Sequence, residues 1–289
     1  MATHVQQHYV PRFLLERWHS GPDGKLTQFQ WLRGALRADR FTAKAVAKEE
    51  HLYSQRRSEG EPNVALERDF LGPHIDEPAA NAHRKILLDG HQSLSSQERY
   101  EWSRFLLSLL VRTPQMVAFL RGYGRQVMEQ MLDEQPEGMA HLRKNNPAMV
   151  LREWAEVHRP HLLDDVGVRA LPTILTSQEL NQALLDGAWS TESLAGSNVD
   201  ALITDNPVVY LGDIKKGFSF MLPIATDRAF VVASHPDDMA RVAQMRRTGL
   251  TKSLNRHLVK HASRYVYATG LQHQNLIKKH LRQAYEPHP

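Results

Sequence analysis

The 289-residue sequence predicts an α+β fold, in which a mostly helical middle packs on a small mixed β-sheet formed by the two ends of the chain. Apolar residues recur at helical spacing between residues 63 and 185. Strand-like runs occur instead at 26–31 and again after residue 199. Since no internal repeat is present, we expect a single domain over 1–289, with one point of subdivision into a mainly helical part, 1–195, and a mixed part, 196–289.

The N-terminal segment is expected to be ordered and to begin a helix. Pro11 suits the first turn of a helix, and Phe13, Leu14 and Trp18 follow it at helical spacing. A turn then precedes a strand at 26–31, where apolar and polar residues alternate. The stretch that follows, 43–53, is interpreted as a short helix or an approach to a strand.

Helix signals dominate the middle of the chain. Residues 63–90 have helical spacing, which the prolines at 73 and 78 must break or kink. Ser95–Glu98 matches a capping box and starts a helix to Arg112, which bends at Pro114 and resumes to Met131. A loop is expected at 135–146 and a helix at 148–158. A second capping box, Thr176–Glu179, starts a helix that runs to Leu185.

The last third of the chain returns to strand signals before it ends in helices. Strands are expected at 199–204, 208–211, 218–224, 229–233 and 264–268. Helices are expected at 236–247, at 251–263 and at the end of the chain.

The composition is that of an ordinary globular protein, with 42% hydrophobic and 24% charged residues. The absence of cysteine excludes disulfides, thiol catalysis and thiolate-bound zinc. No signal-peptide pattern is present, and the longest apolar run, 105–111, is too short to cross a bilayer. We therefore expect a cytoplasmic protein without a membrane partner. The net charge of +4 is compatible with nucleic acid or a nucleotide as a partner.

The first candidate site is the segment His8–Leu14. An imidazole can act as a general base near neutral pH, and the guanidinium of Arg12 can hold a phosphate or carboxylate at the positive end of the helix. The alternative is structural: His8 bonded to a backbone carbonyl and Arg12 paired with Glu16 one turn away. Tyr9, between them, is counted as a ligand-binding candidate.

A second candidate lies between two predicted strands, at Asp205 and Asn206. A carboxylate and an amide at a strand end suit a metal ion or a ribose hydroxyl. The same residues before Pro207 are natural formers of a β-turn. Arg112, which ends an apolar run, must emerge at a helix terminus or pair inside the protein, as a C-terminal cap or as an anion clamp facing the same cavity as Arg12.

Acidic residues of the helical middle, among them Glu67 and Glu77, are the remaining metal-ligand candidates. With Asp205 they would hold a divalent ion, Mg²⁺ or Mn²⁺, if the fold brings them together. The alternative is a solvated helix face. Asn255 stands among basic residues on a predicted helix, either as a ligand-binding amide or as part of a solvated basic face. The Lys278–Arg282 run adds positive charge near the end of the chain.

The order of several short motifs resembles a widespread, mainly bacterial family catalogued as a domain of unknown function. These motifs are Gln7–Leu14, Glu49–Tyr53, Arg112–Pro114, Thr204–Val208, Leu222–Pro223, Leu254–Asn255 and Tyr265–Tyr267. The resemblance covers about residues 6 to 268. This sequence departs from the family pattern at Ile224–Ala225 and at Glu50–Tyr53. The family implies no activity, but it selects the polar positions that the fold is expected to bring together.

The leading hypothesis is a phosphodiester-directed enzyme, a hydrolase of the nuclease class. His8 would be the general acid or base, Arg12 and Arg112 would stabilise the charged transition state, and Asp205 would orient His8 or hold a metal ion. The alternative is a non-catalytic module that binds nucleotides or nucleic acid, in a bacterial defence or toxin system. The third hypothesis is a scaffold protein that binds no such ligand. No phosphate-binding loop or nucleophile elbow occurs to decide between them.

Overall fold

The computed structural model describes residues 5–56, 61–134, 141 and 149–282. The chain opens with strand β1 (Gln6–His8), which pairs antiparallel with β4 (Lys48–Glu50). Between them lie the short helix α1 (Arg12–Leu15), which follows Pro11 as predicted, the 3₁₀ turns η1 (Glu16–Trp18) and η2 (Ala43–Ala45), and the hairpin of β2 (Leu26–Leu32) and β3 (Ala35–Phe41).

The predicted union of the two chain ends is confirmed. Strands β2 and β3 share a four-stranded sheet, ordered β3-β2-β10-β6, with β6 (Ile203–Thr204) and β10 (Val266–Ala268) from the C-terminal part. Every pairing in this sheet is antiparallel, with Val266 opposite both Phe29 and Thr204. The sheet is therefore antiparallel rather than mixed, which corrects that detail of the predicted α+β fold.

The middle of the chain is helical, as expected. Leu66–Asp76 (η3) is a π-helix that contains Pro73, and α2 (Glu77–Asp89) follows with Pro78 in its first turn. The 3₁₀ turn η4 (His91–Ser93) precedes α3 (Ser96–Val111), which begins at the predicted capping box of Ser95 and Glu98. After Arg112 and Thr113, α4 (Pro114–Asp133) continues.

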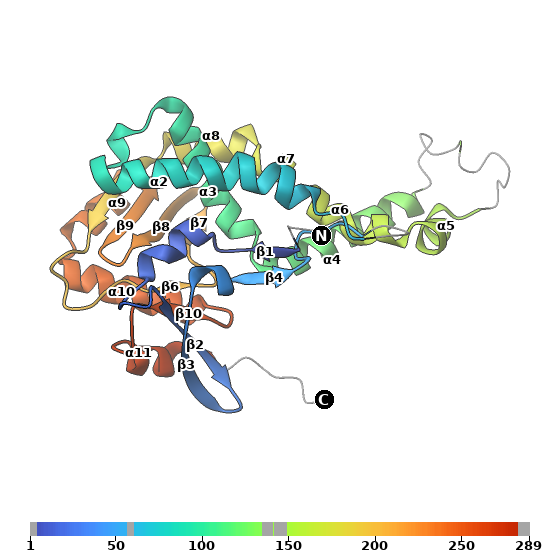
Figure 1. Ribbon diagram of the computed structural model, residues 1–289. Helices are drawn as coiled ribbons and strands as arrows, with labels where there is room; N and C mark the ends of the chain where they lie inside the picture. The colour runs from blue at the N-terminus through green and yellow to red at the C-terminus, as the bar shows by residue number, and fades with distance from the viewer. Residues whose placement is uncertain (1–4, 57–60, 135–140, 142–148, 283–289) are drawn as a thin grey trace.

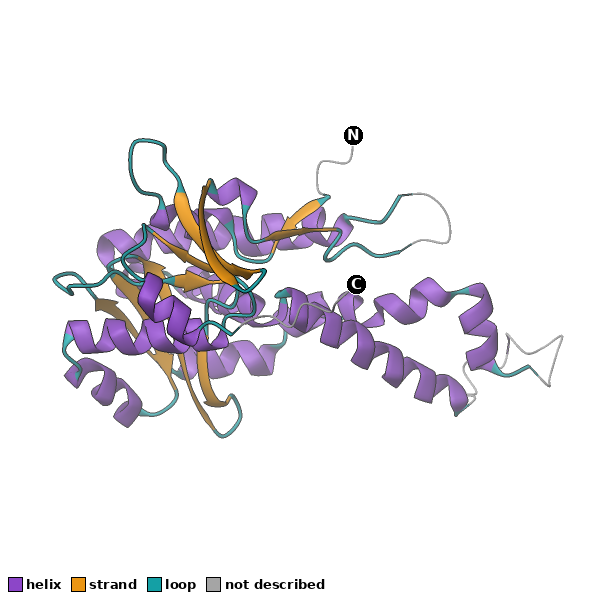
Figure 2. Cartoon of the chain, turned by 90° about the horizontal axis from the view of Figure 1, so that it is seen from below, coloured by secondary structure: helices purple, strands orange, loops and turns teal. Residues whose placement is uncertain are grey.

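An arm of helices extends to one side of the molecule in both Figure 1 and Figure 2. It consists of α4, α5 (Leu151–His158) and α6 (Pro160–Arg169). Gly124 and Gly167 allow the backbones of α4 and α6 to touch, since a Cβ on Gly167 would lie 1.8 Å from the carbonyl oxygen of Leu120. Most of the loop expected at 135–146 lies outside the described residues.

The chain returns to the body through α7 (Leu171–Leu175) and α8 (Gln178–Asp186). The cap of α8 is Ser177, whose hydroxyl accepts from the Leu180 N–H, one residue later than the predicted box at Thr176. A second antiparallel sheet follows, ordered β5-β9-β8-β7. Its strands are β5 (Ala188–Ser193), β7 (Val209–Asp213), β8 (Gly217–Ala225) and β9 (Arg228–Ala233). The helices α9 (Pro236–Gln244), α10 (Arg247–His261) and α11 (Gln274–His280) complete the fold.

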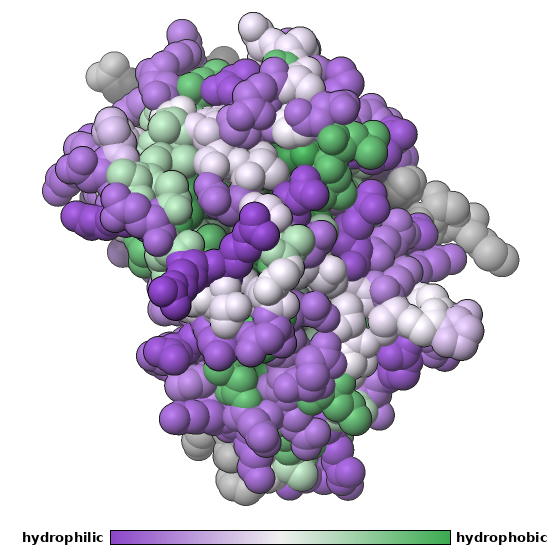
Figure 3. All heavy atoms as spheres, turned by 90° about the vertical axis from the view of Figure 1, so that its left-hand side faces the viewer, coloured by the Kyte–Doolittle hydropathy of each residue, from purple (hydrophilic) through white to green (hydrophobic). Residues whose placement is uncertain are grey.

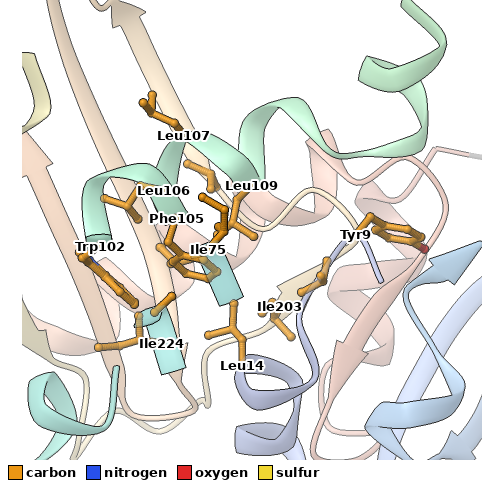
Figure 4. Close-up of a cluster of buried hydrophobic side chains, with 14 of the residues drawn as sticks. Tyr9, Leu14, Ile75, Trp102, Phe105, Leu106, Leu107, Leu109, Ile203 and Ile224 are labelled. Atoms are coloured by element: carbon orange, nitrogen blue, oxygen red, sulfur yellow. The ribbon is translucent and has the colours of Figure 1, made fainter. Parts of the chain in front are cut away.

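One hydrophobic core joins distant parts of the chain. Leu14, Trp102, Phe105 and Ile224 are fully buried within it, and Tyr9 lies at one end with its hydroxyl directed away from the cluster (Figure 4). The face on the left of Figure 1 is mostly hydrophilic, with apolar residues in small separate patches (Figure 3). Among the described residues, no helix is both long and apolar enough to span a membrane.

Candidate functional site

The N-terminal segment is tied firmly into the fold, as the sequence predicts. The Gln7 side chain accepts a hydrogen bond from the Tyr53 N–H over 2.5 Å and donates to the Ser54 hydroxyl over 3.1 Å. The Tyr9 N–H donates to the Ala47 carbonyl. Because side chains alternate across extended backbone, His8 points away from the side on which Gln7 and Tyr9 are buried.

On its own side, His8 faces a surface hollow of about 310 Å³, here called the His8 hollow. The N-terminal segment forms one wall, and the π-helix η3 with the start of α2 forms the other. The hollow is lined by His8, Pro11, Arg12, Phe13, Glu67, Gly72, Asp76, Glu77 and Ala80. Four of the residues singled out from the sequence, His8, Arg12, Glu67 and Glu77, therefore share one site.

His8 is a neutral imidazole in this setting. Its pKa is lowered to about 4 by burial first and then by the charges of Lys48, Arg12 and Arg112, while a backbone hydrogen bond at Lys44 acts in the opposite direction. Its Nε2 is buried and has no hydrogen-bond partner among the described residues. A buried nitrogen with a free lone pair keeps its capacity to accept a proton or a hydrogen bond.

Glu67 is a second titratable group in the hollow, and its pKa is shifted in the opposite direction to that of His8. Burial, and then the charge of Asp76, raise the pKa of Glu67 to about 7 against the lowering effect of Arg112. At neutral pH a large share of this carboxyl group is protonated and able to donate a proton. A carboxyl and an imidazole with pKa values pushed apart in one hollow are the usual arrangement of an acid–base pair.

Arg112 pairs inside the protein, and only 1% of it is exposed. Its Nε donates to the Tyr9 carbonyl over 3.0 Å, and its Nη1 donates to the Asp76 carboxylate over 2.8 Å. It therefore lies behind Asp76 and does not line the hollow, so the predicted clamp facing the same cavity as Arg12 is wrong. Its Nη2 is buried without a partner among the described residues.

Arg12 is the cation that a ligand can reach. Its side chain is 52% exposed and lies 3.6 Å from the Glu16 carboxylate one turn away, which is the structural pairing considered for it. An exposed pair of this kind contributes little and is easily exchanged for a ligand anion. Arg12 can therefore bind an anion in the hollow without breaking a buried contact.

Asp205 lies with Tyr9 and not with His8. Its carboxylate accepts hydrogen bonds from the backbone N–H groups of Ser263, Arg264 and Tyr265, at 2.6 to 2.9 Å. Burial raises its pKa to about 6 against the lowering effect of these bonds. Asp205 therefore orders the turn before β10, and the expectation that it orients His8 from within one pocket is wrong.

The Tyr9 side chain is buried on this second side of the segment. Burial, followed by the nearby Asp205 carboxylate, raises the pKa of its hydroxyl well above the usual range. The hydroxyl is neighboured by that of Tyr267, from β10. The ligand-binding candidate Tyr9 is not among the described residues that line the hollow, but its backbone carbonyl accepts a hydrogen bond from Arg112.

The two candidate asparagines also lie elsewhere. Asn255 is buried on α10, where its Oδ1 accepts from the Leu202 N–H and its Nδ2 donates to the Asp200 carbonyl, both over 2.8 Å. It supports the chain before β6 and does not line the His8 hollow. Asn206 lines a second hollow of about 700 Å³ between α4 and α10, here called the α4–α10 groove.

The predicted metal-ligand set is divided between two places. Glu67 and Glu77 line the His8 hollow, whereas the Asp205 carboxylate is surrounded by backbone N–H groups. Within the described parts of the chain, no three His, Asp or Glu side chains form a group suited to hold a metal ion. The three predicted ligands therefore do not form the expected Mg²⁺ or Mn²⁺ site.

Asp76 is one of the acidic candidates of the helical middle, but the sequence did not predict its pairing with Arg112. It stands among other acidic residues, and nothing local distinguishes it from a solvated helix face. The available signal was indirect: an arginine that ends a buried run, such as Arg112, requires an acidic partner when it is taken out of water. The sequence did not show which carboxylate supplies it.

Comparison with known proteins gives a family for this chain. No curated protein and no solved structure matches the sequence. A family model does match nearly the whole chain, and it includes the N-terminal segment, the His8 hollow and the turn at Asp205. With residues 6–270 matched, the chain belongs to the family described as "Protein of unknown function (DUF4238)".

Proposed function

We propose that this protein is a phosphodiester-directed hydrolase of the nuclease class, with its chemistry in the His8 hollow. One observation carries the proposal. A neutral imidazole with an unpartnered Nε2, a carboxyl group whose pKa is raised to about 7, and an accessible guanidinium line the same hollow. These groups are a base, an acid and an anion-binding group.

In the proposed reaction, Arg12 holds the non-bridging oxygens of the phosphodiester. His8 Nε2 takes a proton from a water molecule as the water oxygen bonds to phosphorus. The bond from phosphorus to the leaving oxygen breaks, and Glu67 gives its proton to that oxygen. The products are a phosphomonoester and an alcohol, with the removed proton on His8 and the donated one replaced from solvent.

Binding of the anion also prepares His8 for this step. The positive charges of Lys48, Arg12 and Arg112 contribute to the low pKa of the imidazole. A phosphodiester bound to Arg12 offsets these charges and raises the pKa of the imidazole toward its ordinary value. The base therefore becomes stronger when a substrate is present.

Arg112 and Asp205 act as positioning residues in this proposal. Arg112 fixes the backbone at Tyr9, the residue after His8, and holds Asp76 beside Glu67. Asp205 lies near Tyr9 on the opposite side of the same segment and orders the turn before β10. Both therefore affect the hollow without touching the substrate.

The proposed substrate is nucleic acid or a nucleotide, and the proposed compartment is the cytoplasm. A bacterial defence or toxin system is the proposed biological setting. The net charge of +4 favours association with a polyanion at low ionic strength.

The test is a cleavage assay on labelled RNA and DNA oligonucleotides with Mg²⁺, with Mn²⁺ and with a chelator. We expect His8→Gln and Glu67→Gln each to lower the rate by 10²-fold or more, the usual contribution of a general acid or base. His158→Gln is the matched control, because His158 lies on α5 in the arm and hydrogen-bonds the Trp154 carbonyl of the same helix. A folded His8→Gln protein that cleaves at the wild-type rate would contradict the proposal.

The second candidate is a module that binds the same ligands without hydrolysing them. The accessible guanidinium of Arg12 favours it, since binding an anion requires that cation but no proton transfer by His8 or Glu67. Thermal shifts with nucleotides and oligonucleotides, followed by chromatography of the ligand, separate the two candidates. Stabilisation of the protein with unchanged ligand supports binding alone.

A further inference from the structure

We infer that the α4–α10 groove and the basic surface beside it bind single-stranded nucleic acid. This inference rests on the proposed function only for the purpose of binding a strand. The evidence for the binding surface itself comes from separate observations. The groove shares no lining residue with the His8 hollow. Its walls are Gln115, Met116 and Phe119 of α4 and His257 and His261 of α10, with Tyr210 of β7 between them.

Two aromatic rings stand exposed at the α4 wall. Phe119 is 60% and Tyr123 is 57% exposed, and their rings stack with centroids 5.9 Å apart and planes within 7°. Residues four apart on a helix meet in this way, but two large exposed rings leave much apolar surface in water. Parallel exposed rings are suited to stacking on unpaired bases, which every base permits through its flat face.

Unpaired cations cover the neighbouring surface. Arg256 and Lys260 on α10 and Lys279 on α11 are exposed, and no ion pair involves them within the described residues. The pKa of His280 is lowered by desolvation and by the charges of Lys260, Lys279 and Arg256, so these cations come together across the two helices.

The basic surface continues into the groove. The pKa of His257, in the groove wall, is lowered by burial, then by the stacked His261, 4.3 Å away, and by Lys260. None of the described residues that line the groove carries a carboxylate. A phosphate backbone that follows Lys260 and Lys279 is therefore not repelled by a carboxylate among the described residues that line the groove.

The aromatic wall selects for single strands. In a duplex the flat faces of the bases are already stacked on each other, whereas a single strand can turn its bases onto protein rings. The groove volume of about 700 Å³ is in the usual range of a small-molecule site and admits bases from a flexible strand. We therefore assign the phosphates to α10 and α11 and the bases to Phe119 and Tyr123.

The experiment measures fluorescence anisotropy of labelled oligodeoxythymidine with the full chain over a series of salt concentrations. One variant, Lys260→Ala with Lys279→Ala, removes two cations, and another, Phe119→Ala with Tyr123→Ala, removes both rings. The controls are Arg84→Ala and Leu88→Ala on α2, where Leu88 is 81% exposed and Figure 1 shows the helix well separated from α11. A denaturing gel after each titration shows whether the strand is intact.

The two variants have different expected effects. Loss of two phosphate contacts lowers the slope of log Kd against log salt by about 1.4. Loss of the rings weakens binding by about fivefold or more without a change in that slope. Both controls bind as the wild type does. An unchanged Kd in both groove variants, an equal loss in the controls, or equally tight binding of duplex DNA would each overturn the inference.

The outcome is independent of the His8 chemistry. Binding with the expected variant effects supports the groove whether or not the strand is cleaved. Cleavage that requires His8, with no effect of the groove variants on binding, supports the hydrolysis and contradicts the groove.

Discussion

Arg112 donates from its Nε to the backbone carbonyl of Tyr9 over 3.0 Å, although the two residues are 103 positions apart. The same guanidinium donates to Asp76, so one buried cation joins the N-terminal segment, the π-helix η3 and the end of α3. The Tyr53 hydroxyl in turn donates to the Arg112 carbonyl over 2.7 Å. The wall of the His8 hollow thus depends on a residue that does not line it.

Replacement of Arg112 by methionine should destabilise the protein by about 3 kcal/mol, because it leaves the Asp76 carboxylate and the Tyr9 carbonyl without their partner. The double variant Arg112→Met with Asp76→Asn should recover part of this loss, since the unpaired charge is then absent. Urea unfolding of the wild type, both single variants and the double variant measures this coupling. Additive losses would contradict an energetic link between the two residues.

Replacement of Asp205 by alanine should cost about 3 kcal/mol of stability, because three backbone N–H groups lose a charged acceptor. Urea unfolding checks this value against Asp39→Ala, which removes an exposed carboxylate from β3. We further expect folded Asp205→Ala protein to retain most of its affinity for a ligand of the His8 hollow. A large loss of ligand affinity without a loss of stability would instead place Asp205 at the ligand.

Local signals in the sequence predicted the elements that depend on local contacts. The capping box of Ser95 and Glu98 requires only four consecutive residues, and it starts α3 as expected. Strand β3 gave no such signal, because both of its faces are largely exposed and carry no alternation. Strand β5 is likewise mostly polar and is defined by its pairing with β9, about 40 residues later.

The sequence predicted the types of residue in the candidate site better than it predicted which of those residues lie together. His8 and Arg12 lie close in sequence, so one hollow could be expected for them. The division of the remaining candidates follows from backbone needs that a sequence does not display. Asp205 and Asn255 satisfy buried N–H and carbonyl groups of distant segments, which only the folded chain brings near.

The close packing of the arm gives a matched pair of glycine variants. Gly167→Ala should destabilise the arm by more than about 2 kcal/mol, since its Cβ would meet the Leu120 backbone of α4. Gly122→Ala, on the same helix α4, meets nothing within 4 Å and should stabilise the protein by about 0.5–1 kcal/mol. Thermal unfolding of both variants measures the difference, and equal melting temperatures would contradict the close approach of α4 and α6.

The raised pKa of Glu67 predicts a characteristic pH dependence of stability. The folded state holds this proton up to pH about 7, whereas an unfolded glutamic acid releases it near the ordinary pKa of 4.5. The contribution of Glu67 to stability is therefore fully present below pH 4.5 and is lost as the pH rises through 7. Glu67→Gln should flatten this part of the stability curve in urea unfolding at a series of pH values.

The same two pKa values predict a bell-shaped pH dependence of kcat/KM for hydrolysis. Activity requires neutral His8 and protonated Glu67, so it should fall below pH about 4, where the imidazole is protonated, and above pH about 7, where the carboxyl group ionises. Because kcat/KM reports the free enzyme, the rise of the His8 pKa on substrate binding should move the acid limb of the kcat profile to higher pH. Glu67→Gln should remove the alkaline limb together with most of the rate. An alkaline limb that persists unchanged in Glu67→Gln would assign the proton donor to another residue.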